Sequence, residues 1–139
     1  MATIKAYTDL SQSKKLAEIL PLESADMTYY ACVKDWHGNS VEPKWGKPTT
    51  LTKEELALPC SNFQEYEYVH CWSLAALLNI VSTYCSRLEI TLRADKNYNI
   101  FAVSGDFVFR SFDECSEGYN NIVDACYEMI IRLNELKLL

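Results

Sequence analysis

The chain has 139 residues, of which 49% are hydrophobic and 23% charged, with a formal net charge of −6 at pH 7. This size and composition are typical of a globular protein, so we expect residues 1–139 to form a single domain. The acidic balance disfavours nucleic acid and membrane surfaces as partners, because both attract positively charged proteins.

A first helix is expected directly after Asp9. Asp9 and Gln12 have the spacing of a capping box, in which each residue hydrogen-bonds the backbone of the other. Pro21 should end this helix, because the residue before a proline disfavours helical geometry. The helix has one apolar side, made by Leu10, Leu16, Ile19 and Leu20.

The next stretch is rich in strand-forming residues. Met27–Lys34 carries aromatic and β-branched side chains and predicts a strand. A turn is expected over residues 35–40. A second short strand is expected over residues 41–45, confined to a sheet edge because Pro43 cannot donate a backbone hydrogen bond.

Two shorter elements are expected before the middle of the chain. Residues 52–56 have the pattern of a single helical turn, with Thr52 as its cap and Glu55 completing a second capping box. Residues 64–69 are expected to form a short strand that leads into the central helix.

The most apolar stretch lies between His70 and Val81. Its leucines and alanines recur at spacings of three and four without an interrupting glycine or proline, which predicts a buried helix. Ser73 is the expected N-cap. Cys71 would then lie just before the first turn, where the positive end of the helix dipole stabilises a thiolate.

A three-strand antiparallel meander is expected at 87–112. Leu88, Ile90 and Leu92 alternate with polar residues and should face a core. The returning strands are expected at 98–104 and 107–112. A last helix, capped by Asn120 or Asn121 and running to about Leu136, should bury Ile122, Cys126, Met129, Leu133 and Leu136.

Together these elements predict an α+β fold. We expect an antiparallel β-sheet of about four strands, which includes the meander, with three helices packed mainly on one face.

The six cysteines are expected to be free thiols. The first residues of the chain lack the apolar core of a signal peptide, and no membrane span or lipidation motif is visible, so we expect a cytoplasmic protein. No Cys-x-x-Cys or His-x-x-x-His spacing and no glycine-rich phosphate loop is present, so we expect neither a metal nor another cofactor.

One catalytic alternative rests on Cys71. A Cys-Trp pair that opens an apolar helix resembles the start of the catalytic helix in papain-like cysteine proteases, and Gln64 would supply an oxyanion-hole amide. No histidine follows Cys71, so His37 would have to act as the base. The competing interpretation is that Cys71 is a packing residue, since free cysteine is among the most buried residue types.

A binding surface is the other functional hypothesis. Eight aromatic residues gather between residues 29 and 72, and two of them, Trp36 and Trp45, lie in a polar, turn-rich context. Aromatic residues held on loops are favoured contact residues. We expect Trp36, Trp45, Tyr66 and Tyr68 to contribute to this surface. The competing interpretation is simple packing under a long loop.

Three stretches carry a family resemblance: residues 6–9 with 12–27, residues 71–78 with Cys71-Trp72-Ser73-Leu74, and residues 123–130 with Val123-Asp124-Ala125-Cys126. They are similar to a family of small uncharacterised proteins of Bacteroides-group gut bacteria and their phages and mobile elements. His70 stands where that family has proline. The resemblance implies an accessory protein and brings no activity with it.

We therefore expect a non-enzymatic cytoplasmic binding protein, possessing a protein or small-molecule partner and existing as a monomer or a homodimer. The alternative is a small cysteine hydrolase that uses Cys71.

Overall fold

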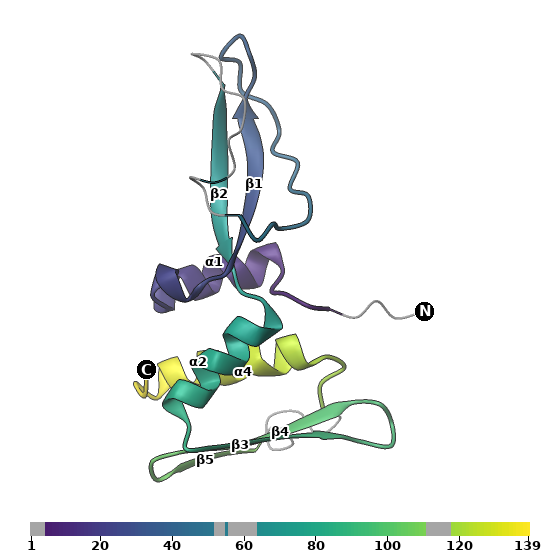
Figure 1. Ribbon diagram of the computed structural model, residues 1–139, viewed down its shortest axis with the longest axis vertical. Helices are drawn as coiled ribbons and strands as arrows, with labels where there is room; N and C mark the ends of the chain where they lie inside the picture. The colour runs from purple at the N-terminus through teal and green to yellow at the C-terminus, as the bar shows by residue number, and fades with distance from the viewer. Residues whose placement is uncertain (1–4, 52–54, 56–63, 111–117) are drawn as a thin grey trace. The chain divides into compact units, whose positions relative to one another are not determined.

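The computed structural model of the chain describes residues 5–51, 55, 64–110 and 118–139. Its elements are α1 (Leu10–Ile19), the 3-10 helix η1 (Leu22–Ser24), β1 (Met27–Lys34), β2 (Glu65–Cys71), α2 (Leu74–Tyr84), β3 (Arg87–Leu92), β4 (Tyr98–Ser104), β5 (Phe107–Arg110) and α4 (Ile122–Glu135) (Figure 1).

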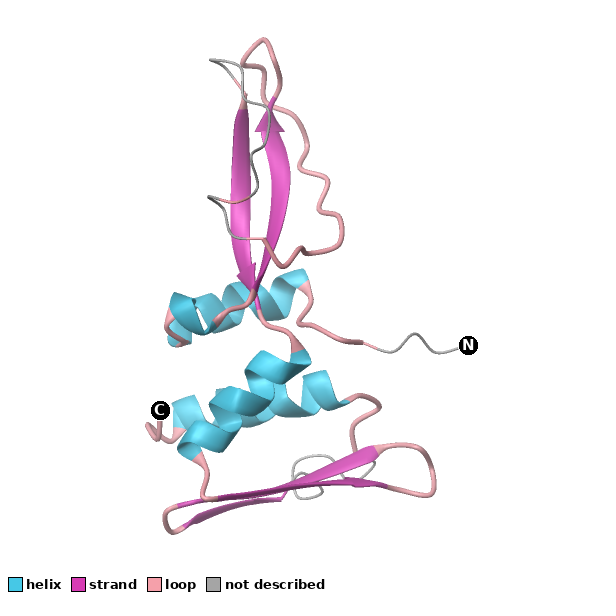
Figure 2. Ribbon diagram, in the orientation of Figure 1, coloured by secondary structure: helices cyan, strands magenta, loops and turns pink. Residues whose placement is uncertain are grey.

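The α+β class is confirmed, and the described strands fall into two antiparallel sheets, β1-β2 and β3-β4-β5 (Figure 2). The expected arrangement was one sheet of about four strands, so the two-sheet division is a difference from the sequence prediction.

The described residues form two compact units. The two-stranded unit is Asp9–Trp72, and the three-stranded unit contains residues 5–8 and Ser73–Leu139. The single-domain expectation for residues 1–139 stays a prediction.

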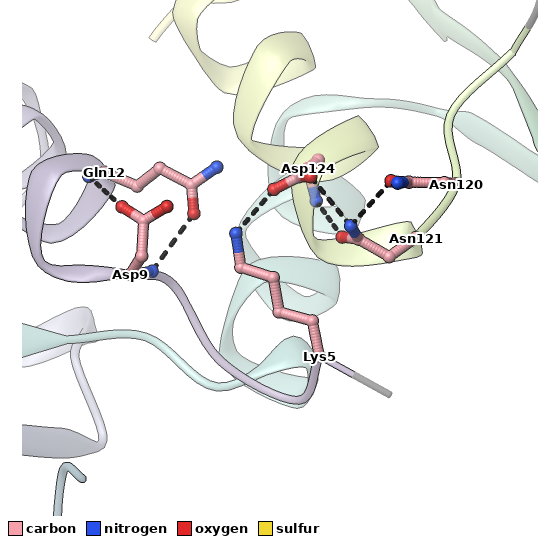
Figure 3. Close-up of polar contacts among 6 residues, drawn as sticks. All are labelled: Lys5, Asp9, Gln12, Asn120, Asn121 and Asp124. Atoms are coloured by element: carbon pink, nitrogen blue, oxygen red, sulfur yellow. Dashed lines mark hydrogen bonds and ion pairs between the residues drawn. The ribbon is translucent and has the colours of Figure 1, made fainter. Parts of the chain in front are cut away.

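In the two-stranded unit, α1 begins at the predicted capping box. The Gln12 backbone N–H donates to the Asp9 carboxylate at 2.7 Å, and the Asp9 N–H donates to Gln12 Oε1 at 3.1 Å (Figure 3). The helix ends at Ile19, shortly before Pro21. Its buried side contains Leu16, and α1 contacts β2.

The β1-β2 pair extends from Met27 opposite Cys71 to Lys34 opposite Glu65, with an irregularity between Cys32 and Lys34. Strand β2 is therefore longer than the predicted 64–69. It ends beside Trp72, which is fully buried and donates its indole N–H to Ser24 Oγ at 2.9 Å. This hydrogen bond satisfies the one polar group of the largest buried side chain, which otherwise would be costly to bury.

The predicted strand over residues 41–45 is wrong. Residues 40–49 pair with β1 only at two isolated bridges, with Ser40 opposite Lys34 and Thr49 opposite Thr28. Pro43 and Pro48 have no backbone N–H, so the segment between the bridges cannot form a regular ladder. The expected helical turn at 52–56 falls outside the described residues except for Glu55.

In the three-stranded unit, both helices begin at predicted caps. Ser73 Oγ accepts from the Ala76 N–H at 3.2 Å, and Asn121 Oδ1 accepts from the Asp124 N–H at 2.7 Å. The helices α2 and α4 pack against each other, α2 contacts β3 and α4 contacts β4. The buried core residues of these elements are Leu77, Ile80, Val81, Ile100, Ala102, Phe109, Val123, Ala125, Cys126, Met129, Ile130 and Leu133.

The meander predicted at 87–112 is confirmed as β3, β4 and β5 over the residues that the structure describes. Two predicted core residues are exposed instead. Leu92 ends β3 and is 55% exposed, and Leu136 caps the end of α4 and is 38% exposed. Both lie at the last position of their pattern, at the end of a strand and of a helix.

Residues 5–8 tie the two helix starts of this unit together. The Leu74 N–H donates to the Ala6 carbonyl at 2.9 Å, and Tyr7 forms a bridge with Ser73. Lys5 Nζ lies 2.6 Å from Asp124 Oδ1 in the first turn of α4 (Figure 3). Within the described residues, no helix combines the length and the apolar character needed to cross a membrane.

Candidate functional site

All residues singled out for binding or catalysis lie in the two-stranded unit. The register of β1 and β2 decides which of them share a face, because directly opposed residues of a ladder point to the same side. Tyr30 lies opposite Tyr68, and Cys32 lies opposite Tyr66. One face of the two-stranded sheet therefore carries three half-buried tyrosines, of which the sequence analysis had singled out Tyr66 and Tyr68.

Gln64 stands at the edge of this tyrosine face. Its Nε2 donates to the Tyr66 hydroxyl at 3.1 Å and lies 3.8 Å from Cys32 Sγ. Among the described residues, Gln64 Oε1 is buried without a hydrogen-bond partner. The amide therefore holds the Tyr66 ring in place, and it is not aimed at Cys71, for which an oxyanion-hole role was considered.

Trp36 lies on the turn that follows β1. The Asp35 carboxylate accepts from the N–H groups of His37 and Asn39, each at 2.9 Å. Backbone bonds from Asp35 to Asn39 and from Gly38 to Asp35, both 3.0 Å, close the same turn. These contacts form a rigid Asx-type turn, and the Trp36 ring that it carries is 58% exposed.

The same turn lowers the pKa of Asp35 below its ordinary value of 3.8. The main cause is the backbone hydrogen bond from Asn39, which stabilises the charged carboxylate, with a further contribution from the His37 N–H. The carboxylate is therefore charged and able to accept both bonds at neutral pH.

Trp45 differs from Trp36. It is half-buried, and Lys14 Nζ of α1 lies 5.9 Å from the centroid of its ring. A cation over an aromatic face is a favourable contact that occupies that face. Trp45 thus packs on its own unit, and Trp36 is the tryptophan displayed to solvent.

The residues of the catalytic alternative do not converge. Cys71 is the last residue of β2 and is fully buried opposite Met27. His37 is exposed and follows the other end of β1. A strand rises about 3.3 Å per residue, so Met27 and Lys34 alone are separated by roughly 23 Å. Gln64 also precedes the far end of β2, so neither partner reaches the thiol.

His70 is no better placed than His37. Consecutive residues of a strand point to opposite faces. Because Cys71 is buried and His70 is exposed on the neighbouring position of β2, the imidazole points away from the thiol. The packing interpretation of Cys71 fits its burial.

The described cysteines, Cys32, Cys71, Cys85 and Cys126, are free thiols. Burial raises the pKa of Cys126 to about 12 and also raises that of Cys85. Such thiols stay protonated at neutral pH and are poor nucleophiles. Cys60 and Cys115 lie outside the described residues. Within the described ranges, no group of three or more His, Cys, Asp or Glu side chains is arranged to hold a metal ion.

A second side-chain cluster escaped the sequence analysis. In the three-stranded unit, Arg87 and Arg110 both lie over the ring of Phe101. Phe101 lies on the face of β4 opposite that of Ile100, and nothing in the sequence indicated which residues of β3 and β5 would lie beside it.

No family model matches the chain, and neither a curated protein nor a solved structure matches it.

Proposed function

We propose that this chain is a non-enzymatic cytoplasmic binding protein that recognises a protein partner through the turn after β1, with Trp36 as the anchor. The observation that carries the proposal is the combination of a 58% exposed indole with a turn held by four hydrogen bonds. Tryptophan is enriched among the residues that dominate binding energies.

The rigidity of the turn supports a role in recognition. An anchor residue that is already held in place loses little conformational freedom when it binds, so more of its contact energy appears as affinity. The chain closes the turn with Asp35 and Gly38, which has a φ of +78°, and places the ring between them. A purely connecting turn has no need of a large apolar side chain at this position.

Exposed apolar and charged residues flank the turn that carries Trp36. Val41, whose N–H donates to the Val33 carbonyl at 3.0 Å, is 37% exposed on the returning chain. Lys34 and Glu65 form an exposed ion pair of 3.3 Å beside the turn. An apolar centre with a charged rim is the usual composition of a protein-protein contact.

A protein partner is favoured over a small molecule by the position of the ring. Small-molecule sites are concave and enclose most of their ligand. The turn that follows β1 lies at the far end of the two-stranded sheet from α1 (Figure 1), and Trp36 is an exposed residue of this turn. A projecting ring of this kind inserts into a pocket of its partner.

The cytoplasmic assignment within this proposal is supported by the four free thiols, which are typical of a reducing compartment. The net charge of −6 supports a partner other than nucleic acid or an anionic membrane. The resemblance to accessory proteins of Bacteroides-group bacteria and their mobile elements belongs to the same proposal and suggests the cells in which to look for the partner.

Photo-crosslinking tests the proposal. The purified protein, with benzoylphenylalanine in place of Trp36, is irradiated in a cell lysate, and crosslinked adducts are identified by mass spectrometry. Leu51, 42% exposed in the same unit, receives the same replacement as the matched control. We expect an adduct that is specific to position 36 and that purified wild-type protein competes away, whereas the Trp36→Ala variant does not.

The Trp36→Ala variant should keep the circular dichroism spectrum and unfolding midpoint of the wild type, because an exposed ring contributes little to the core. Identical adducts from positions 36 and 51, or competition by Trp36→Ala as strong as that by the wild type, would refute the proposal.

A further inference from the structure

The outer face of the three-stranded sheet carries an organised group of side chains. The inner face contains the buried Ile100, Ala102 and Phe109. The alternate positions form two rows across the strands, Glu89-Phe101-Arg110 and Arg87-Val103-Val108. We call these six residues the arginine face.

Phe101 is the centre of the arginine face. The Arg87 guanidinium carbon lies 5.4 Å from the centroid of the Phe101 ring, and that of Arg110 lies 5.8 Å from it. Both distances fall within the range of a cation–π contact. Because the arginines come from strands on either side of β4, the ring brings two guanidinium groups together on one surface.

The two arginines differ in how far their charge is already balanced. Arg87 forms an ion pair of 2.9 Å with Glu89 on its own strand. Arg110 has no carboxylate partner among the described residues, and its side chain is exposed. The N–H donors of Arg110 are therefore available to an external acceptor, and the planar guanidinium suits a bidentate acceptor.

Apolar surface adjoins these charges. Val108 is 44% exposed, and Val103, its neighbour across the strands, is half-buried. A ligand of this face must therefore combine acceptor groups with apolar side chains.

We propose that the arginine face binds an acidic peptide segment of another protein, whose carboxylates pair with Arg110 and Arg87 and whose apolar residue packs on Val108 and Val103. Charge complementarity selects this occupant, because the planar guanidinium matches a carboxylate with two parallel hydrogen bonds. Recognition of acidic motifs by paired arginines is a common mode of peptide binding.

Single-stranded nucleic acid fits the arginine face less well. Binding to a phosphate backbone depends on several positive charges along a groove and on aromatic platforms for successive bases. The arginine face has one aromatic ring, includes the Glu89 carboxylate, and belongs to a chain of net charge −6. A carboxylate peptide with few charges meets less repulsion there.

The test uses the full chain and a short peptide that contains two glutamates and one leucine and carries an uncharged dye. Fluorescence anisotropy measures its affinity, and methyl NMR shifts of Val103 and Val108 report where it binds. The same peptide with glutamine in place of glutamate controls for charge, and a labelled oligouridine tests the other class of ligand.

Arg110→Gln and Arg87→Gln should each weaken binding roughly tenfold, which corresponds to the loss of one charge-assisted contact. Lys96→Asn is the matched control, because it removes one positive charge from the turn between β3 and β4 and asparagine suits the backbone φ of +70° there. It should change the affinity less than about twofold, since an exposed charge away from the contact is screened.

Binding that is lost with the glutamine peptide, that falls in both arginine variants and that shifts Val103 and Val108 supports the proposal. Absence of binding overturns it. So does an affinity of either arginine variant that equals that of the wild type, shifts confined to other residues, or tighter binding of oligouridine. Both variants change exposed side chains, so their circular dichroism spectra should match that of the wild type.

Discussion

Lys5 Nζ lies 2.6 Å from Asp124 Oδ1, and the other carboxylate oxygen of Asp124 accepts a hydrogen bond from Asn121 Nδ2 at 2.7 Å (Figure 3). The N-terminal segment is thereby tied to the first turn of α4. The carboxylate also lies in the first turn of the helix, where a negative charge interacts favourably with the helix dipole.

Lys5→Met should reduce the free energy of unfolding by roughly 0.5–1 kcal/mol, the upper part of the range for partly exposed ion pairs. Both side chains are only partly exposed, 24% and 33%, so screening is incomplete. Urea denaturation followed by circular dichroism measures the change.

The control is Lys15→Met, because Lys15 and Glu18 form a 3.5 Å pair whose side chains are 51% and 68% exposed. It should cost less than about 0.5 kcal/mol; an equal loss in both variants would mean that the Lys5 contact is no more than a surface pair.

Gly118→Ala should be the most damaging of three glycine substitutions. Gly118 has a φ of +75°, and an added Cβ would lie 2.9 Å from the Tyr98 carbonyl oxygen. That oxygen accepts a backbone hydrogen bond from Tyr119 at 2.9 Å, so it cannot move freely. We expect a loss of about 2 kcal/mol or more in the free energy of unfolding.

Two other glycines separate the contributions of backbone strain and of close contact. Gly105 has a φ of +59° with nothing near its added Cβ, so Gly105→Ala should cost about 1 kcal/mol. Gly46 has open space and no positive φ, so Gly46→Ala should cost less than about 0.5 kcal/mol. A cost for Gly118→Ala no larger than that for Gly105→Ala would show that the Tyr98 contact does not matter.

Cys126 should make stability depend on pH in the alkaline range. Its pKa is about 12 in the fold against an ordinary value of 9.0, so the unfolded chain loses this proton first. Deprotonation then favours the unfolded state, and stability falls as the pH rises from about 9 toward 12. Denaturant unfolding across this range should show a shallower fall for Cys126→Ala than for the wild type.

Tyrosines and lysines titrate in the same pH range, and they affect the free energy of unfolding of the wild type and of Cys126→Ala alike. The difference between the two proteins therefore reports on Cys126. Alkylation of native protein at pH 9, read by mass spectrometry, should also modify the half-buried Cys32 well before Cys126. Parallel pH profiles for the two proteins would contradict the assigned burial of this thiol.

Asp35 should control the turn that carries Trp36. Its pKa lies below 3.8 because the Asn39 and His37 N–H groups stabilise the carboxylate. The charged form therefore stabilises the folded turn above the ordinary value, and this contribution is lost as the pH falls through the lower pKa of the folded state. NMR should show the amide signals of His37 and Asn39 shifting together at a pH below 3.8.

Asp35→Asn provides the control, because its amide oxygen still accepts hydrogen bonds but does not titrate. In this variant the two amide signals should no longer shift over the acidic range. Signals that titrate unchanged in Asp35→Asn would show that another group causes the effect.

Local features of the fold could be predicted from the sequence because they depend on residues close together in the chain. The caps at Asp9, Ser73 and Asn121 were predicted and are present. A cap needs only one side chain and the backbone within the next turn. The alternation of 88–92 likewise predicted the meander, although Leu92, the last residue of the pattern, is exposed.

The candidate site was predictable only as a set of residue types. The sequence indicated that Trp36 and Trp45 are unusual in a polar context, but it did not distinguish them. Lys14 of α1 covers part of Trp45, and only the packing of that helix decided this. Cys71 was expected to precede a helix start, and it does, but the pairing of β2 with β1 buries it and separates it from His37.

The sequence by itself determined the α+β class, the helix caps and most strand positions, because turn chemistry and hydrophobic periodicity act over a few residues. Tertiary structure alone decided that the strands form two sheets, that the segment after Ser40 is not a strand, and that Arg87 and Arg110 meet on Phe101. These features depend on strand register and on contacts between residues far apart in the chain, which no local pattern specifies.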